Sequence, residues 1–172
     1  GRLEDMSIGI ECPLCEDMAT ARSQASRLHQ INQERRVIEQ VMQDEALRIL
    51  AKLELHEASN LPVAMTLYQS GWHQGVIGIL ASRIKDRLHR PTIAFADGDA
   101  GELKGSARSI PGIHIRDILD AVATRHPGLV TRFGGHAMAA GLTLPREVYD
   151  EFATAFVAEV ERHAQDVHLQ AV

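Results

Sequence analysis

Residues 16–55 of this chain contain neither glycine nor proline, the residues that most often interrupt a helix. Apolar side chains recur through the stretch at helical spacings, as at Leu28, Ile31 and Met42. A helix of that length measures about 60 Å at 1.5 Å per residue, which exceeds the diameter of a small domain. We therefore predict one long helix over residues 16–59 that connects two domains. A two-helix hairpin with a hidden break is the alternative.

The pattern changes after Pro62, where short apolar runs alternate with amphipathic segments. The expected strands cover 63–68, 92–96, 102–109 and 140–144, the expected helices cover 75–89, 114–125 and 145–163, and a glycine-rich loop covers 134–135. The order β-α-β-β-α-β-α predicts an α/β domain over residues 60–165, with a mixed β-sheet flanked by helices. Residues 166–172 are assigned to a flexible end.

The net charge of −5 argues against a protein that coats nucleic acid indiscriminately. The charge is unevenly distributed, because residues 71–145 contain nine Lys or Arg against six Asp or Glu, with five of the nine histidines. We therefore expect an anionic ligand to bind in the middle of the chain. No run approaches the roughly 18 apolar residues that span a bilayer, and the first residues do not resemble a signal peptide. These observations predict a cytoplasmic protein without a membrane partner.

Cys12 and Cys15 are the two cysteines of the chain, and one pair does not complete a four-ligand zinc site. We expect them to be bystander thiols in a reducing compartment, with a zinc or redox role as the lesser alternative. No cluster of Asp and His elsewhere has the pattern of a two-metal site. We therefore assign no metal ligand in this chain.

Three donor-rich segments lie in the basic middle of the chain. The first, 69–75, falls between an expected strand and an expected helix, where unpaired N–H groups attract anions. Gly75 allows a ligand to approach the backbone, and His73 and Gln74 add hydrogen-bond donors. Trp72 either stacks on a base or covers the core. A plain tight connection between strand and helix is an equal alternative.

The second segment lies on the expected strand 102–109, which begins its polar run at Lys104. Ser106 and Arg108 share one face of such a strand, because side chains alternate between faces. The guanidinium of Arg108 suits phosphate, and Ser109 offers a second hydroxyl. An ordinary polar strand face is the alternative.

The third segment is Gly134-Gly135-His136. Two glycines followed by a histidine and small residues indicate backbone that another group approaches closely. A lone histidine is more often structural, but its place behind two glycines in the basic region favours a phosphate contact. The chain has only seven aromatic residues, one Trp, two Tyr and four Phe, so base stacking cannot be the main mode of binding. Contacts to the nucleic-acid backbone would dominate.

Together these segments resemble the RecJ family of single-strand-specific DNA exonucleases, in the DHH phosphoesterase superfamily. The resemblance rests on GWHQGVIGI (71–79) with ASR (81–83), on GSARSIPG (105–112) and on FGGHAMAAG (133–141), which match in order and spacing. Residues 1–15 look like the tail of the family's catalytic DHH domain, and the long helix looks like its connector.

The resemblance implies that a catalytic domain N-terminal to this chain holds two divalent ions, manganese or magnesium. Residues 60–165 would form the DHH-associated domain, whose partners are single-stranded DNA and that catalytic domain. Pattern and resemblance together assign substrate contacts to Trp72, His73, Gln74, Gly75, Arg83, Lys104, Ser106, Arg108, Ser109, Gly134, Gly135 and His136. His136 would donate a hydrogen bond to a phosphate oxygen, or else help to protonate the leaving group. The implied activity of the intact protein is 5′-to-3′ exonuclease action in DNA repair and recombination, with this fragment alone inactive.

Two alternatives differ from this interpretation. One is a DHH-family phosphodiesterase for short oligonucleotides or cyclic dinucleotides, because such enzymes share the Gly-Gly-His motif. The other is a non-catalytic module in which the long helix mediates assembly.

Overall fold

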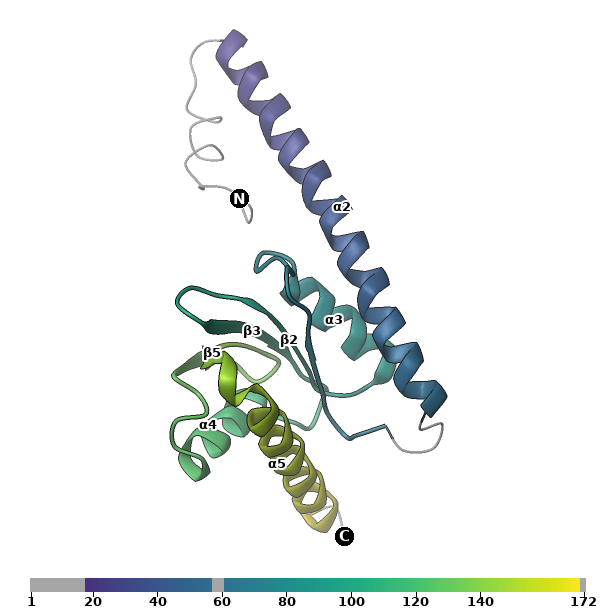
Figure 1. Ribbon diagram of the computed structural model, residues 1–172, viewed down its shortest axis with the longest axis vertical. Helices are drawn as coiled ribbons and strands as arrows, with labels where there is room; N and C mark the ends of the chain where they lie inside the picture. The colour runs from purple at the N-terminus through teal and green to yellow at the C-terminus, as the bar shows by residue number, and fades with distance from the viewer. Residues whose placement is uncertain (1–17, 57–60, 171–172) are drawn as a thin grey trace.

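The computed structural model describes residues 18–56 and 61–170, so the predicted tail at residues 1–15 lies outside the described residues. The first described element is α2 (Met18–His56), one uninterrupted helix of 39 residues. In Figure 1 the C-terminal part of α2 lies against the rest of the molecule, whereas its N-terminal part extends away from it. The predicted long helix is confirmed, and the hairpin alternative is wrong for this segment.

A five-stranded sheet forms the centre of the domain, in the order β1-β2-β3-β5-β4. The strands are β1 (Met65–Tyr68), β2 (Thr92–Asp97), β3 (Glu102–Arg108), β4 (Arg132–Gly135) and β5 (Ala139–Pro145). β1 and β2 are parallel and are connected by α3 (Ile77–Leu88), whereas all other neighbouring strands are antiparallel. The predicted α/β class with a mixed sheet is confirmed.

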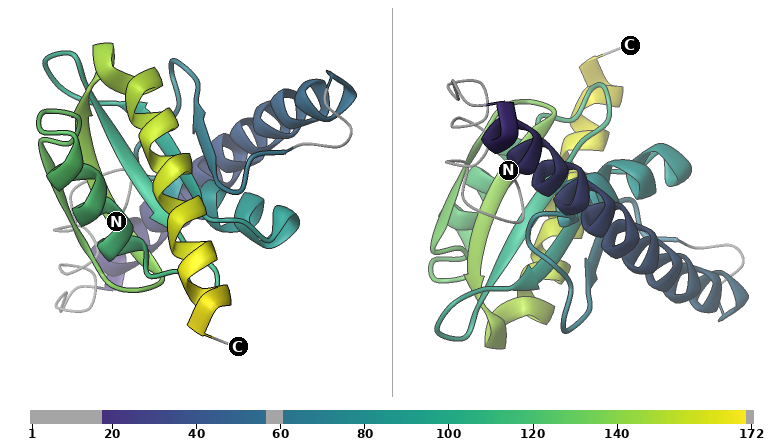
Figure 2. Two further views of the ribbon diagram at one scale, coloured as in Figure 1. Left: turned by 90° about the horizontal axis from the view of Figure 1, so that it is seen from below. Right: turned by 90° about the horizontal axis from the view of Figure 1, so that it is seen from above.

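Helices cover the two faces of the sheet unequally. On one face, α4 (Ile115–Arg125) and α5 (Tyr149–Gln170) enclose the larger hydrophobic core. On the other face, α3 packs on β2 and β3, and α2 adds Met42 to the smaller core that α3 forms with side chains of β1 and β2. Figure 2 shows α2 and α5 on opposite sides of the sheet. On this face of the sheet, α3 covers β2 and β3 rather than β5 and β4.

The larger core is organised around the ring of Phe95 on β2. This ring meets Phe152 edge-on with centroids 5.7 Å apart, and Phe152 stacks on Phe156 at 6.0 Å. Such aromatic pairs add about 0.5–1.5 kcal/mol beyond the area that they bury. Gly105 of β3 lies directly beside Phe95, because a Cβ there would be 2.6 Å from Phe95 Cε1 and 2.6 Å from Leu142 Cδ2. The sheet packs this closely only without a side chain at Gly105.

Two predicted boundaries are wrong. Residues 132–135 form the edge strand β4, where a glycine-rich loop was expected at 134–135. Gly is depleted in strands, but pairing with β5 overrides this preference, and Thr131 begins the pairing by donating its N–H to the Thr143 carbonyl at 2.9 Å. The last helix begins at Tyr149 after a short 3-10 turn and continues to Gln170, beyond the expected end at 163.

Substituting Gly105 with Ala should destabilise the fold by about 1–3 kcal/mol, because the added methyl group forces Phe95 or Leu142 out of place. Urea unfolding should show a lower midpoint with an unchanged slope. Gly141→Ala is the matched control, since a Cβ there would lie 3.9 Å from its nearest neighbour, the Gly105 carbonyl. A control as unstable as Gly105→Ala would contradict this account of the core.

Candidate nucleic-acid interface

One face of β3, β5 and β4 remains free of the large apolar core, and we call it the open face. Residues such as Leu103, Ala107 and Leu142 point to the other side, where they are buried with α4 and α5. Because side chains alternate along a strand, their neighbours point to the open face. These neighbours are Glu102, Lys104, Ser106 and Arg108 of β3, Ala139, Gly141, Thr143 and Pro145 of β5, and Arg132 and Gly134 of β4. The open face therefore carries three cations against one carboxylate, and small residues lie at its middle.

A row of small residues crosses the middle of the open face. Ser106 pairs with Gly141, and Gly141 pairs with Gly134 on the edge strand. A Cβ at Gly134 would meet nothing within 4 Å, and one at Gly141 only the carbonyl of Gly105 at 3.9 Å. Two adjacent strands, about 5 Å apart, thus present backbone without a covering side chain. A ligand can approach the main chain closely at this row.

Arg108 and Ser106 are held together at one end of the row. The guanidinium of Arg108 donates from Nη1 to the Ser106 hydroxyl at 3.0 Å and to the Ala107 carbonyl at 2.8 Å. Its Nη2 lies against α3, because a Cβ at Gly78 would be 2.8 Å from it. The predicted pairing of Ser106 and Arg108 on one face is thus observed. The contacts orient a fork of donors beside the row.

Lys104 lies on β3 beside the row, on the side opposite Arg108, with two residues that the sequence analysis missed. Its Nζ donates to the Thr143 hydroxyl at 3.3 Å and lies 3.6 Å from Glu102. Arg132 lies 3.9 Å from the same carboxylate, and its side chain is 75% exposed. Arg132 and Thr143 become recognisable only when 132–135 is read as a strand paired with β5.

The hairpin between β4 and β5 places His136 at the edge of the open face. Gly135 has φ +149°, and a Cβ there would be 2.4 Å from the Ala139 carbonyl oxygen. The His136 N–H donates to that carbonyl at 2.8 Å, which closes the turn. The side chain of His136 is exposed. The three residues of the predicted motif thus differ, since Gly134 is open, Gly135 is structurally required and His136 faces solvent.

Ser109 supports this hairpin from inside. It is 1% exposed, and its hydroxyl donates to the Ile113 carbonyl at 2.6 Å. Its N–H donates to the Met138 carbonyl at 3.0 Å, and the Ile115 N–H donates to the Ala137 carbonyl at 2.9 Å. Ser109 therefore holds the hairpin tip against the start of α4, and its hydroxyl is already engaged.

The first predicted segment contacts α2 more than it contacts the open face. Trp72 is buried and donates its indole N–H to Glu45 of α2 at 2.8 Å. Arg83 of α3 also reaches α2. The His73 ring accepts the Gly75 N–H at 3.0 Å, and the Gln74 amide donates to the Asp97 carbonyl at 2.7 Å. Of the two roles considered for Trp72, the structure shows the packing role.

The described residues include no group of three or more His, Cys, Asp or Glu side chains arranged to hold a metal ion. Among the helices in residues 18–56 and 61–170, none combines the length and apolar character needed to cross a membrane.

Comparison with known families matches residues 59–162 to the DHHA1 domain. This chain belongs to the DHHA1 domain family. The matched residues include all five strands of the sheet and every residue of the open face.

Curated relatives of this DHHA1 domain protein are named as exonucleases. It is 55% identical over 156 residues to the single-stranded-DNA-specific exonuclease RecJ of Dickeya dadantii (strain 3937), a match that covers 91% of this chain and 27% of that protein. It is 49% identical over 172 residues to RecJ of Haemophilus influenzae, covering 100% of this chain and 30% of the relative. The resemblance to RecJ is confirmed, and the chain spans less than a third of these relatives.

Solved structures agree. Crystal structures of RecJ from Thermus thermophilus in complex with Mg²⁺ and with Mn²⁺ match this DHHA1 domain protein with TM-scores of 0.77 and 0.78. Sequence identity is 28% in both cases, and the matches cover 94% of this chain but 23% and 22% of those chains.

Substituting Gly135 with Ala should disrupt the hairpin, because the methyl group would overlap the Ala139 carbonyl and φ +149° is strained for any other residue. We expect a loss of stability of about 1–3 kcal/mol, measured by thermal or urea unfolding. Gly134→Ala is the matched control one residue away and should unfold like the parent. Equal destabilisation by both changes would show that the two glycines are not distinguished by space.

Proposed function

We propose that this DHHA1 domain binds the phosphate backbone of single-stranded DNA across its open face, as the substrate-binding part of a RecJ-type exonuclease. The observation that carries the proposal is the row Ser106–Gly141–Gly134, with Arg108 on one side of it and Lys104 on the other. Cations and backbone groups that bind phosphate convey no base sequence. Such a surface suits an exonuclease, which must act on every sequence that it meets.

Within this proposal, the direct contacts come from the open face and the hairpin. Arg108 presents its guanidinium, Ser106 its hydroxyl and Lys104 its ammonium group to phosphate oxygens. His136 donates a hydrogen bond to a phosphate oxygen near the scissile bond, a role that we prefer to protonation of the leaving group. Gly134 and Gly135 allow the strand to approach.

Six further residues complete the proposed substrate site by holding its parts together, namely Trp72, His73, Gln74, Gly75, Arg83 and Ser109. Their effect on DNA binding is indirect, because their polar groups already contact α2, the loop after β1 or the hairpin tip.

We propose a division of labour within the intact protein. Residues 1–15 end a catalytic DHH domain, residues 16–59 connect it, and residues 60–165 bind substrate. The manganese or magnesium ions present in RecJ crystals would belong to that catalytic domain, since the described residues here do not suit them. The activity would be 5′-to-3′ hydrolysis of single-stranded DNA in the cytoplasm, serving repair and recombination.

The Arg108→Ala change should weaken binding of single-stranded DNA about tenfold, because it removes one charge-assisted phosphate contact. The loss should be similar for different base sequences, and the slope of log K against log salt should become shallower by about one. Fluorescence anisotropy with labelled oligonucleotides at several salt concentrations measures both quantities.

Arg125→Ala is the matched control for Arg108→Ala. Arg125 is 53% exposed and lies on α4, behind the sheet, where it pairs with Glu159 at 3.4 Å. Removing it changes net charge equally without touching the open face. An unchanged salt slope for Arg108→Ala, or an equal effect of the control, would refute binding at the open face.

The isolated 172-residue chain should bind single-stranded DNA weakly and cut it not at all when Mn²⁺ or Mg²⁺ is added. The reason is that its described residues offer no metal site. Gel analysis of a labelled oligonucleotide provides the measurement, with the intact protein as positive control. Metal-dependent cleavage by the pure chain would contradict the proposal that the metal site lies in another domain. If the intact protein instead prefers dinucleotides to long single strands, the alternative of a DHH-family phosphodiesterase is favoured.

A further inference from the structure

Asp97, the last residue of β2, gathers hydrogen bonds from segments that are distant in the sequence. Its carboxylate accepts from the Tyr68 hydroxyl at 2.7 Å and from the Gly71 N–H at 3.2 Å. The Ser70 hydroxyl donates to it at 3.3 Å, and the Arg146 guanidinium forms an ion pair with it. One carboxylate therefore ties the loop after β1 to the turn after β5.

These donors keep Asp97 charged. The hydrogen bonds from Tyr68 and Gly71, with the nearby Arg146, hold the pKa of the Asp97 carboxyl below its usual range. The hydrogen bond to Asp97 raises the pKa of Tyr68, so its hydroxyl remains a donor at neutral pH. The Asp97 carbonyl also accepts from the Gln74 amide at 2.7 Å. Asp97 thus holds the loop near both of its ends.

The loop that Asp97 holds is also the one that contacts α2. The buried ring of Trp72 packs in the smaller core beside Met42 of α2, and its N–H donates to Glu45 at 2.8 Å. The N–H of His73 points at the Met42 sulfur at 3.4 Å. Any shift of the loop must therefore move these contacts on α2.

A second set of contacts comes from α3, which begins just after the loop. Arg83 forms an ion pair with Glu39 and a hydrogen bond with Gln43, both on α2. Together with the loop, Arg83 grips α2 over about two turns, residues 39–45. Contacts spread along a helix in this way fix its direction as well as its position.

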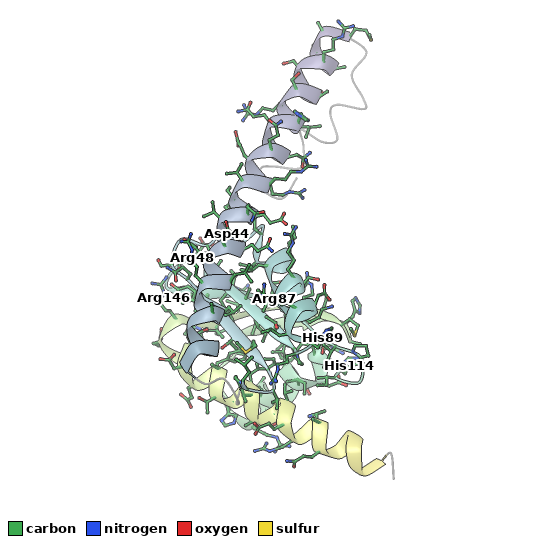
Figure 3. All side chains as sticks on the ribbon, turned by 90° about the vertical axis from the view of Figure 1, so that its right-hand side faces the viewer. Asp44, Arg48, Arg87, His89, His114 and Arg146 are labelled. Atoms are coloured by element: carbon green, nitrogen blue, oxygen red, sulfur yellow. The ribbon has the colours of Figure 1, made fainter. Side chains whose placement is uncertain are left out.

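A small change in the direction of α2 is magnified at its far end. Arg22 lies 20 residues before Met42, which corresponds to about 30 Å of helix. A tilt of about 10° at the grip would move Arg22 by about 5 Å. In Figure 3, Arg146 lies on the same side of the view as Asp44 and Arg48 of α2.

We propose that Asp97 is a positioning residue that sets the direction of α2 relative to the open face, through the loop that carries Trp72. This role rests on the proposed function in one respect, because the catalytic domain is placed at the far end of α2. Asp97 then determines where that domain meets the phosphate held on the open face. It touches neither DNA nor metal in this role.

Distances between spin labels in the intact protein test the proposal. One label is placed on α5 by Glu151→Cys, and the other on α2 by either Arg22→Cys or Val37→Cys, in a protein whose own cysteines are changed to serine. All three positions are exposed. Asp97→Ala should shift or broaden the Arg22 distance by several ångströms and the Val37 distance much less, because Val37 lies close to the grip.

Two further variants keep this test decisive. Asp99→Ala, in the same turn but exposed, should leave both distances unchanged. Glu45→Ala breaks the α2 end of the same path and should reproduce the Arg22 shift, while the double variant with Asp97→Ala should shift no further. Parent-like distances in folded Asp97→Ala would overturn the proposal, as would a shift of equal size at Val37 and Arg22.

Exonuclease kinetics separate positioning from general loss of stability. Asp97→Ala should lower kcat on single-stranded DNA about ten- to hundredfold with little change in KM, because the open face is intact while the catalytic domain is displaced. Asp97→Asn, which keeps an oxygen acceptor, should recover part of the loss. A rise in KM alone would refute the role. If the intact protein lacks exonuclease activity, the proposed function fails, yet the label distances still decide the role of Asp97.

Discussion

The antiparallel pairing of β3 with β5 is the constraint on which the rest of the domain depends. Seven residue pairs join the two strands, from Glu102↔Pro145 to Arg108↔Ala139. A slip of one residue would exchange the two faces, so that charged side chains would enter the core. Gly105 opposes such a slip, because only a glycine fits between Phe95 and Leu142. One register therefore creates both the apolar core and the basic open face.

Much of the fold follows from local pattern. The absence of glycine and proline predicts α2, and hydrophobic periods predict three helices and four of the five strands. β4 escapes prediction because Gly134 and Gly135 have no intrinsic preference for a strand, and only pairing with β5 makes them one. A strand that exists through its partner leaves little signal in its own residues.

The candidate site is likewise predictable from the sequence only in part. Alternation along a strand suffices to place Ser106 and Arg108 together, which the structure shows. The partner of Trp72 is not predictable by such means, because Glu45 is 27 residues away and the contact depends on how α2 docks. Segments that looked alike in the sequence, each rich in donors near glycine, thus serve different purposes, one on the open face and one at the grip on α2.

Gly134 and Gly141 face each other on β4 and β5 without contributing to either core. A Cβ at Gly134 would meet nothing within 4 Å and one at Gly141 only the Gly105 carbonyl at 3.9 Å, so the described part of the domain has room for an alanine at both positions. Under the proposed function, a side chain at either position would stand between the backbone and the bound phosphate. Natural variation there would record the shape of the ligand, and a selection for well-expressed, well-folded protein would retain variants that have lost it.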